Sequence, residues 1–495
     1  MELQIQNEKI NIKQSISKTK KNITIEKDYI LPDNKPDIIK VQTQNANIYV
    51  TKNEKMENKL KIDGGVSLRI AYLTSEGKNR VLTIEEMFSE LMEVQGVTSE
   101  TFINEKLNVT SIEINILNER KIHYKVSTEC SIKASKKESI EFIHEINQNH
   151  QLQILNKKMM VDSYVGHAES KIYLKEKIDI ENVQENIEVV KIEPVINNIE
   201  NKMSYNKVLV KADCTLKCLY ITESGTLYMA KKEVPLMGFL DIENVEDTNN
   251  CQIEITMRNL LVEENGKDVN PGINVEMEFN VIGDVYQNKE INLLEDLYCL
   301  NHKSEYSSQK IMLENCRGDN SETSKIKKKI VVEDINQLYD SEYRIINIEE
   351  KGNYIEGKIA ASYIYSSFEN PGINRKEEII DFDLTLERQS VNSEVVIKNT
   401  KSIILPDSSI DVEIELEISS FSEKNEINLI KEIRIDDADN DDGYSMVVYI
   451  VKPGDSLWKI AKKFNSTIPE IVGINEITNE DKLNIGDKLY IPRAI

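Results

Sequence analysis

The sequence predicts a mainly β protein in which three tandem β-sandwich-like domains are followed by a small β-α-α-β module. Three observations predict this arrangement: a strand-like alternation that recurs three times, polar segments between the recurrences, and a change to helical spacing near the C-terminal end. A chain of 495 residues is also too long for one compact core, so several domains are expected.

The repeated element is an alternating segment that ends in a tyrosine and a polar turn. The three copies are "LKIDGGVSLRIAYLTSEG", "VLVKADCTLKCLYITESG" and "YIEGKIAASYIYSSFENPG", which end their alternation at Tyr72, Tyr220 and Tyr365. Apolar or small residues occupy every second position before each tyrosine, which is the period of a strand with one buried face. Two further strand-like segments follow each copy in the same order, so the repeat indicates tandem domains rather than a short-period solenoid.

The recurrences set the expected domain boundaries. We expect β domains at residues 23–137, 176–287 and 330–435, an acidic linker at 436–446 and the C-terminal module at 447–493. The chain from about Glu290 to Lys329 is polar and predicts an exposed linker.

The acidic linker contains a spacing that invites a calcium-loop interpretation. Asp437, Asp439 and Asp441 alternate as the first ligands of such a loop would, but the sixth and twelfth positions hold Asp442 and Val448 instead of Gly and Glu. A solvated linker is therefore favoured, and no metal site is expected there.

Composition excludes several classes of protein. The net charge of −23 argues against nucleic-acid binding, which needs a basic surface. The segment from Met446 onward is nearly neutral, so the acidity belongs to the body. The first residues show no secretory signal, and apolar runs stop far short of the roughly 20 residues that cross a bilayer. No transmembrane segment is expected.

Cysteines and histidines give no sign of chemistry. Cys214 and Cys218 fall on one face of a predicted strand and are interpreted as buried thiols, because no CxxC spacing occurs. The five histidines form no constellation, and His123, in the strand "IHYKV", is expected to face solvent or to satisfy a loop. No catalytic motif stands in a credible context, so we expect neither an enzyme nor a cofactor.

A short proline-containing motif precedes the first repeat. In "ILPDNKPDIIKV" (Ile30 to Val41), Pro32 and Pro36 predict a rigid turn that leads into a strand. This motif, followed by an alternating strand ending in "AYL", resembles the opening of the SPOCS domain of clostridial spore coat morphogenetic proteins. The second and third repeats lack the two prolines. Three such units before one C-terminal module resemble the SipL-type group, which implies a scaffold made in the mother-cell cytoplasm and gathered at the forespore surface.

The C-terminal module can be derived from its own residues. "YIVKPGDSL" predicts a strand at Val448 to Lys452 and a turn at Pro453-Gly454, after which Asp455 or Ser456 can cap a helix. The apolar face of that helix is Leu457, Ile460, Ala461 and Phe464.

A second helix and a final strand complete the module. Thr467 and Glu470 form a capping box, and Pro469 sits in the first helical turn, where its missing N–H costs little. Ile471 and Ile474 are expected to point inward, and a last strand at Leu489 to Ile491 stops at a proline.

The motifs "GDSLWKIAKKF", "IVGIN" and "LNIGDKLYIP" in this order resemble a LysM module. The resemblance implies a shallow groove that binds N-acetylglucosamine chains. By position, its two sides are Gly454, Asp455, Ser456 and Leu457, and Ile474, Asn475, Glu476 and Ile477. Trp458 either stacks on a sugar ring or covers the small core.

Two binding functions follow from the resemblances. The SipL-type resemblance implies that the LysM module docks to SpoIVA, the ATPase of the coat basement layer, and that the β domains bind other spore coat proteins. The alternative is a peptidoglycan-binding protein that uses the LysM groove. The missing export signal favours the protein partner, because peptidoglycan lies across a membrane from a cytosolic chain.

Overall fold

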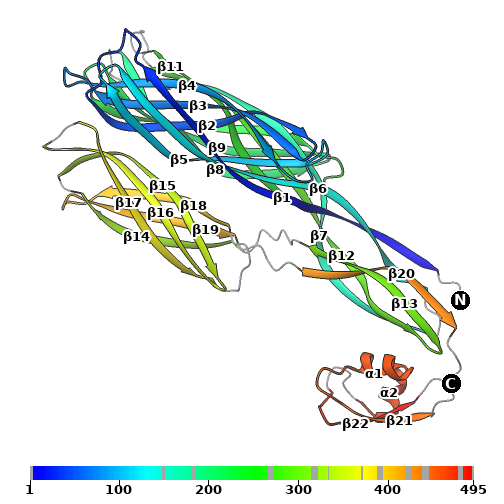
Figure 1. Ribbon diagram of the computed structural model, residues 1–495. Coiled ribbons are helices and arrows are strands. Elements are labelled where there is room, and N and C mark those ends of the chain that lie inside the picture. The colour runs from blue at the N-terminus through cyan, green and yellow to red at the C-terminus, as the bar shows by residue number, and fades with distance from the viewer. Residues whose placement is uncertain are drawn as a thin grey trace.

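The computed structural model describes residues 4–147, 151–180, 185–265, 272–313, 321–332, 334–369, 372–386, 394–419, 425–437, 445–477 and 483–492. Its architecture is almost entirely antiparallel sheet, with two short helices near the C-terminal end (Figure 1). The mainly β prediction and the β-α-α-β end are both confirmed.

The first set of strands forms a sandwich of two three-stranded sheets, ordered β1-β6-β5 and β2-β3-β4. Its strands are β1 (Ile5–Ile30), β2 (Lys40–Met56), β3 (Lys59–Leu73), β4 (Asn79–Glu93), β5 (Phe102–Asn118) and β6 (Lys121–Ile146). The core between the sheets contains Leu68, Ile70 and Tyr72 of β3 against Ile122 and Tyr124 of β6. The alternating segment thus lies in the central strand of its sheet, as its buried face requires.

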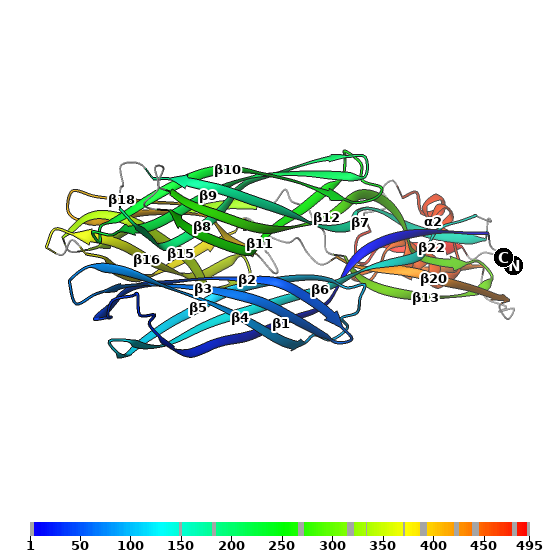
Figure 2. The ribbon, with the colours of Figure 1, turned by 90° about the horizontal axis from the view of Figure 1, so that it is seen from above.

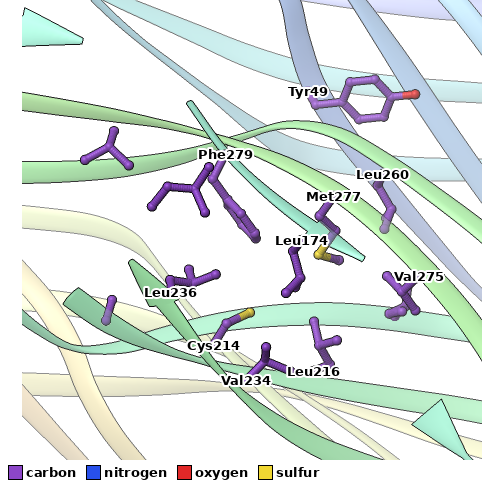
Figure 3. Close-up of a cluster of buried hydrophobic side chains, with 14 of the residues drawn as sticks. Tyr49, Leu174, Cys214, Leu216, Val234, Leu236, Leu260, Val275, Met277 and Phe279 are labelled. Carbon is purple, nitrogen blue, oxygen red and sulfur yellow. The ribbon is translucent and has the colours of Figure 1, made fainter. Parts of the chain in front are cut away.

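The second set repeats this order, with sheets β11-β12-β7 and β10-β9-β8. Its strands are β7 (Leu152–Asp179), β8 (Ile187–Ser204), β9 (Lys207–Thr222), β10 (Leu227–Asp241), β11 (Asn250–Asn265) and β12 (Gly272–Cys299). Cys214 and Cys218 are buried and unpaired in β9, as expected. Figure 3 shows Cys214 among Leu236, Met277 and Phe279, with Tyr49 of the first set reaching the same cluster.

The third set has the same sheet order, β14-β19-β18 and β15-β16-β17, and an additional pair, β13-β20. Its strands are β13 (His302–Leu313), β14 (Ser321–Val331), β15 (Ile335–Lys351), β16 (Tyr354–Ser367), β17 (Asn374–Thr385), β18 (Glu394–Ile404), β19 (Ser409–Ser419) and β20 (Asn425–Asp437). The segment from Glu290 to Lys329 was expected to be linker. Its described residues are instead the end of β12, β13 and most of β14.

One backbone hydrogen bond recurs where each central hairpin closes. The donors are Val94, Ile242 and Leu386, and the acceptors are the carbonyl groups of Asn58, Asn206 and Asn353, over 2.9, 3.1 and 2.8 Å. Sequence reasoning did not find this turn, because asparagine is its only common residue.

The three sets meet along a shared apolar contact. Ala71, Leu219 and Ile364 each precede a repeat tyrosine, and all three lie in one buried cluster. Because neighbouring strand residues point to opposite faces, the strand packs with its tyrosine toward its own sandwich and the preceding residue toward the other sets.

Two long strand pairs run on from the first two sandwiches, and the separate pair β13-β20 joins them in a stalk. β1 pairs with β6, β7 with β12, and β13 with β20, and their ends pack Ile10, Phe142, Ile291 and Leu429 into one cluster. Figure 2 shows this narrow stalk at the end that carries the C-terminal helices. The boundaries expected at residues 23, 137, 176 and 287 fall inside β1, β6, β7 and β12, which run on into the stalk.

Two expected features lie partly or wholly outside the described residues. Of the acidic linker, Asp436 and Asp437 end β20, and residues 438–444 are not described. Cys316 and His150 are also outside the described part of the chain.

Candidate functional site in the C-terminal module

The C-terminal module contains β21 (Met446–Ile450), α1 (Leu457–Phe464), α2 (Ile468–Asn475) and β22 (Lys488–Pro492). β21 and β22 pair antiparallel, with Val448 opposite Tyr490. The core consists of Val451, Leu457, Ile460, Ala461, Ile471, Leu489 and Ile491. The first strand begins and ends two residues earlier than expected, because Lys452 already belongs to the following turn.

The turn before α1 is held by Asp455. Its Oδ2 accepts hydrogen bonds from the Lys452 amide and the Tyr449 hydroxyl, each over 2.8 Å, and these bonds lower the pKa of the carboxyl. The α1 cap is Ser456, whose side chain accepts from the Lys459 amide over 3.3 Å. Gly454 has φ +84, and a side chain there would meet open space. Of this expected groove side, Asp455 and Ser456 are therefore engaged in holding the turn.

Leu457 departs from its expected groove position. The side chain is 4% exposed and packs in the module core. A residue at this helical position faces the sheet, so only its backbone can contribute to a surface. This corrects the assignment of the Leu457 side chain to a binding groove.

The second expected groove side is also largely structural. The Asn475 amide donates to the carbonyls of Ile471 and Tyr490 over 2.7 and 2.6 Å, and its Oδ1 accepts from the Tyr490 amide over 2.7 Å. Glu476 is the left-handed C-cap of α2 at φ 50, and Ile477 is half-buried against the core.

Ile474 points the other way from what was expected. We expected it to face inward, but it is 45% exposed. The α2 helix buries Ile471 fully, and Ile474 and Gly473 remain at the surface. The capping box predicted for Thr467 and Glu470 is present, with Pro469 in the first turn.

Trp458 contacts the stalk. Its Nε1 donates to Oδ2 of Asp296 over 2.7 Å, and its ring meets Tyr298 edge-on at 5.0 Å. Both interpretations considered above, sugar stacking and a cover for the small core, left this contact out. Trp458 is half-buried at the edge of the module core and directs its polar edge to the body.

Asp296 is the centre of this contact. Lys462 donates a hydrogen bond to its Oδ1 over 2.5 Å. The Tyr306 hydroxyl donates to the same oxygen over 3.0 Å. Burial opposes ionisation of Asp296, but these bonds together with Trp458 lower the pKa of the carboxyl. Asp296 lies at a bulge in β12, where the pairing with β7 skips one residue.

A second contact joins the α1–α2 turn to the end of β12. The Tyr298 hydroxyl donates to the Ser466 carbonyl over 2.7 Å in a buried position. Asn301 and Asn465, both with positive φ, bond to each other: the Asn465 amide group donates to Oδ1 of Asn301 over 2.7 Å, and its Oδ1 accepts from the Asn301 backbone over 3.1 Å. Sequence reasoning missed Asp296, Tyr298 and Asn301 because they stand in a segment interpreted as linker.

The body has titratable clusters, and the contacts of two of them join one strand to another. Lys191 of β8 is buried and pairs with Asp340 over 2.7 Å and Glu342 over 3.2 Å, both in β15 of the third set. His123 is a half-buried residue of β6 that bonds to Asp28 over 2.8 Å and to Glu26 over 3.2 Å, both in β1 of the same set. Within the described ranges, no group of three or more His, Cys, Asp or Glu side chains could hold a metal ion.

Comparison with known families assigns two segments of this chain. Residues 449–492 match the LysM domain, and residues 185–264 match the domain described as "SipL, SPOCS domain". The second match covers β8 to β11 of the second strand set. No curated protein and no solved structure matches the chain. None of the helices in the described residues has the length and apolar character to cross a membrane.

Proposed function

We propose that this chain, which carries a SipL-type SPOCS domain and a C-terminal LysM domain, is a non-enzymatic scaffold of endospore coat assembly. The observation that carries the proposal is the presence of both domains on one chain. The first and third strand sets share the sheet order of the second, which supports SPOCS-type units at 23–137 and 330–435 as well as at 176–287.

The LysM module docks to the SpoIVA-type ATPase of the coat basement layer in this proposal. The body holds the module through Trp458, Lys462 and Ser466, on α1 and the turn after it. Gly454 and Ile474 are exposed on the module and remain available to a partner. A fixed module presents that surface without the cost of ordering a flexible tether.

The β domains supply surface for other coat proteins. Edge strands β4 and β10 expose Met87 and Leu91, and Met237 and Phe239, at 49 to 67% of their surface. Exposed apolar side chains on edge strands are typical of interaction sites. The proposed location is the mother-cell cytoplasm, at the forespore surface.

The test is a pull-down with the full-length protein. Purified SpoIVA-type ATPase and insoluble peptidoglycan are offered separately to wild type and to Ile474→Arg, with Lys207→Arg on the body as the matched control. We expect retention on the ATPase for wild type and the control. Retention on peptidoglycan alone would contradict the scaffold proposal.

The second candidate function is binding of N-acetylglucosamine chains. It is favoured by Gly454, where positive φ and open space leave the backbone accessible to a sugar. The peptidoglycan arm of the same experiment tests it.

A further inference from the structure

The two edges of the module's sheet differ in whether their outward backbone groups have a hydrogen-bond partner. On β22, the Asn475 side chain bonds both the amide and the carbonyl of Tyr490, and so closes that edge. Within the part of the chain that the structure describes, β21 pairs with β22 and with no other strand. The second edge of the sheet is therefore open.

The alternation of bonded and non-bonded residue pairs between β21 and β22 identifies which backbone N–H and C=O groups point to the open edge. Tyr490 points its backbone groups away from β21 to reach Asn475, and Val448 is its cross-strand partner. In an antiparallel pair, both partners of such a position point outward. Two residues after Tyr490 in β22, Pro492 pairs with Met446. Proline has no N–H to donate, which agrees with a pair whose backbone groups do not bond across the two strands. Met446, Val448 and Ile450 therefore display their N–H and C=O groups on the open edge.

The side chains of the same residues are exposed and apolar. Met446, Val448 and Ile450 are 50, 50 and 60% exposed, and Tyr490 beside them is 40% exposed. An edge strand with an exposed apolar row is a template for another strand, and proteins usually protect such edges with charges or bulges. β21 has neither, which indicates that this edge is used.

The local charge differs from that of the rest of the chain. β21 and β22 contain no acidic residue, although the chain has a net charge of −23. Lys488 lies opposite Ile450, and Lys452 follows the strand. A peptide with alternating apolar residues and an acidic residue near Lys488 is complementary to this edge.

We propose that the open edge of β21 receives an extended segment of the coat-protein partner, which adds as a third strand beside Met446–Ile450. Main-chain bonds then supply affinity, and the apolar row with Lys488 supplies specificity. The inference rests on the proposed docking of the LysM module to a protein, and moves the contact from the groove to the sheet. A second copy of the chain is a poorer occupant, because two bodies of net charge −23 repel each other.

The test separates backbone from side-chain effects in full-length protein, with purified SpoIVA-type ATPase as the probe. Val448→Pro removes the outward N–H and leaves the bonds between β21 and β22 intact, and Val448→Thr keeps that N–H in a β-branched residue. Loss of one main-chain bond predicts about five- to tenfold weaker binding for Val448→Pro. Val448→Thr should bind within about twofold of wild type.

A charge pair and a groove variant complete the design. Ile450→Glu should weaken binding more than Ile450→Lys, because the partner is acidic at that end.

If Val448→Pro binds like wild type while Ile474→Arg loses binding, the edge proposal is overturned and docking through the groove survives. If wild type itself does not bind, the proposed function is overturned. A wild-type dimer that Val448→Pro dissociates would identify a second copy as the occupant and also overturn the proposal. Circular dichroism of each variant confirms that the module is folded.

Discussion

The indole Nε1 of Trp458 donates a hydrogen bond of 2.7 Å to the carboxylate of Asp296, and this bond joins helix α1 of the LysM module to the bulge in strand β12. Trp458→Phe removes the donor but keeps an aromatic ring against Tyr298, so it isolates the hydrogen bond. Bonds to charged groups contribute about 1.5–3 kcal/mol. We expect the amides of α1 to exchange hydrogen about tenfold faster or more in Trp458→Phe than in wild type.

A double-mutant cycle checks that the effect belongs to this pair. Asp296→Ala combined with Trp458→Phe should cost less than the sum of the two single changes, because each single change removes the same bond. Strict additivity would show that the indole N–H is satisfied elsewhere in solution.

The glycine at position 64 is matched to the aromatic ring across the strand pair. Gly64 lies opposite Phe88, and a Cβ at Gly64 would overlap that ring and stand 2.6 Å from the Tyr49 carbonyl. Gly64→Ala should therefore destabilise the protein by about 1–3 kcal/mol in a denaturant titration.

The second strand set supplies the compensating change. At the equivalent pair it has Ala212 opposite Leu236, whereas the third set repeats Gly357 opposite Phe382. Adding Phe88→Leu to Gly64→Ala should recover part of the lost stability. If the double variant is less stable than Gly64→Ala, the contact with the Tyr49 carbonyl is the dominant cost.

We expect the contact between the first two sets to depend on pH through His167. Burial disfavours the protonated ring, yet hydrogen bonds to Asp284 over 3.1 Å and Glu169 over 3.2 Å raise the pKa of His167. The ring also stacks on Phe102 of the first set at 4.4 Å. A raised folded pKa gives stability that is fully present below the unfolded value of 6.5 and is lost as pH rises through the folded pKa.

We therefore expect the urea midpoint of wild type to fall as pH rises above 6.5, and the fall to be smaller in His167→Gln. The matched control is His123→Gln, since the carboxylates that His123 pairs with, Asp28 and Glu26, are each 47% exposed and these ion pairs are partly screened by water. A pH slope that persists in His167→Gln would assign it to other groups. At the acidic limit, the pKa of Asp284 is lowered to about 2 and its contribution disappears as pH falls toward that value.

The proline motif is held by one arginine. Arg120 donates to the carbonyls of Lys35 and Pro32 over 2.6 and 2.9 Å and pairs with Asp37 over 3.0 Å. Lys35 in turn pairs with Glu188 of the second set over 2.5 Å. Arg120→Ala should speed hydrogen exchange at the Lys35 and Ile38 amides by about tenfold.

Arg120→Lys distinguishes charge from geometry. Lysine keeps the charge but cannot bond three acceptors from one planar fork, so we expect most of the loss to remain. Full protection in Arg120→Lys would show that charge alone organises the loop.

The strand pattern was the most predictable part of the molecule. The alternation ending at Tyr72, Tyr220 and Tyr365 correctly identified the central strands β3, β9 and β16, because a period of two reports one buried face. It did not identify Ala71, Leu219 and Ile364 as buried, since their partners lie in other strand sets.

The stalk was not predictable by the same reasoning. Ile10 stands in a polar stretch and is fully buried only because β12 and β20 bring Ile291 and Leu429 against it. Each strand pair of the stalk, taken alone, is too polar in sequence to predict a buried core. The motif match located the LysM module well. The groove positions taken from the family pattern, however, included two residues with structural roles: Leu457 packs in the small core, and Asn475 bonds to the sheet edge.

The stalk also orders the biogenesis of the chain. Ile10 and Leu429 pack in one cluster although 419 residues of sequence separate them, so Leu429 is synthesised long after Ile10. The cluster around Ile10 is therefore complete only after β20 has been synthesised. The LysM module, which docks onto β12, follows β20 in the sequence and is synthesised after it. A chain that terminates before β20 lacks both the strand that completes the stalk and the LysM module. We expect such truncated chains to become substrates for chaperones and proteases before they can enter an assembly.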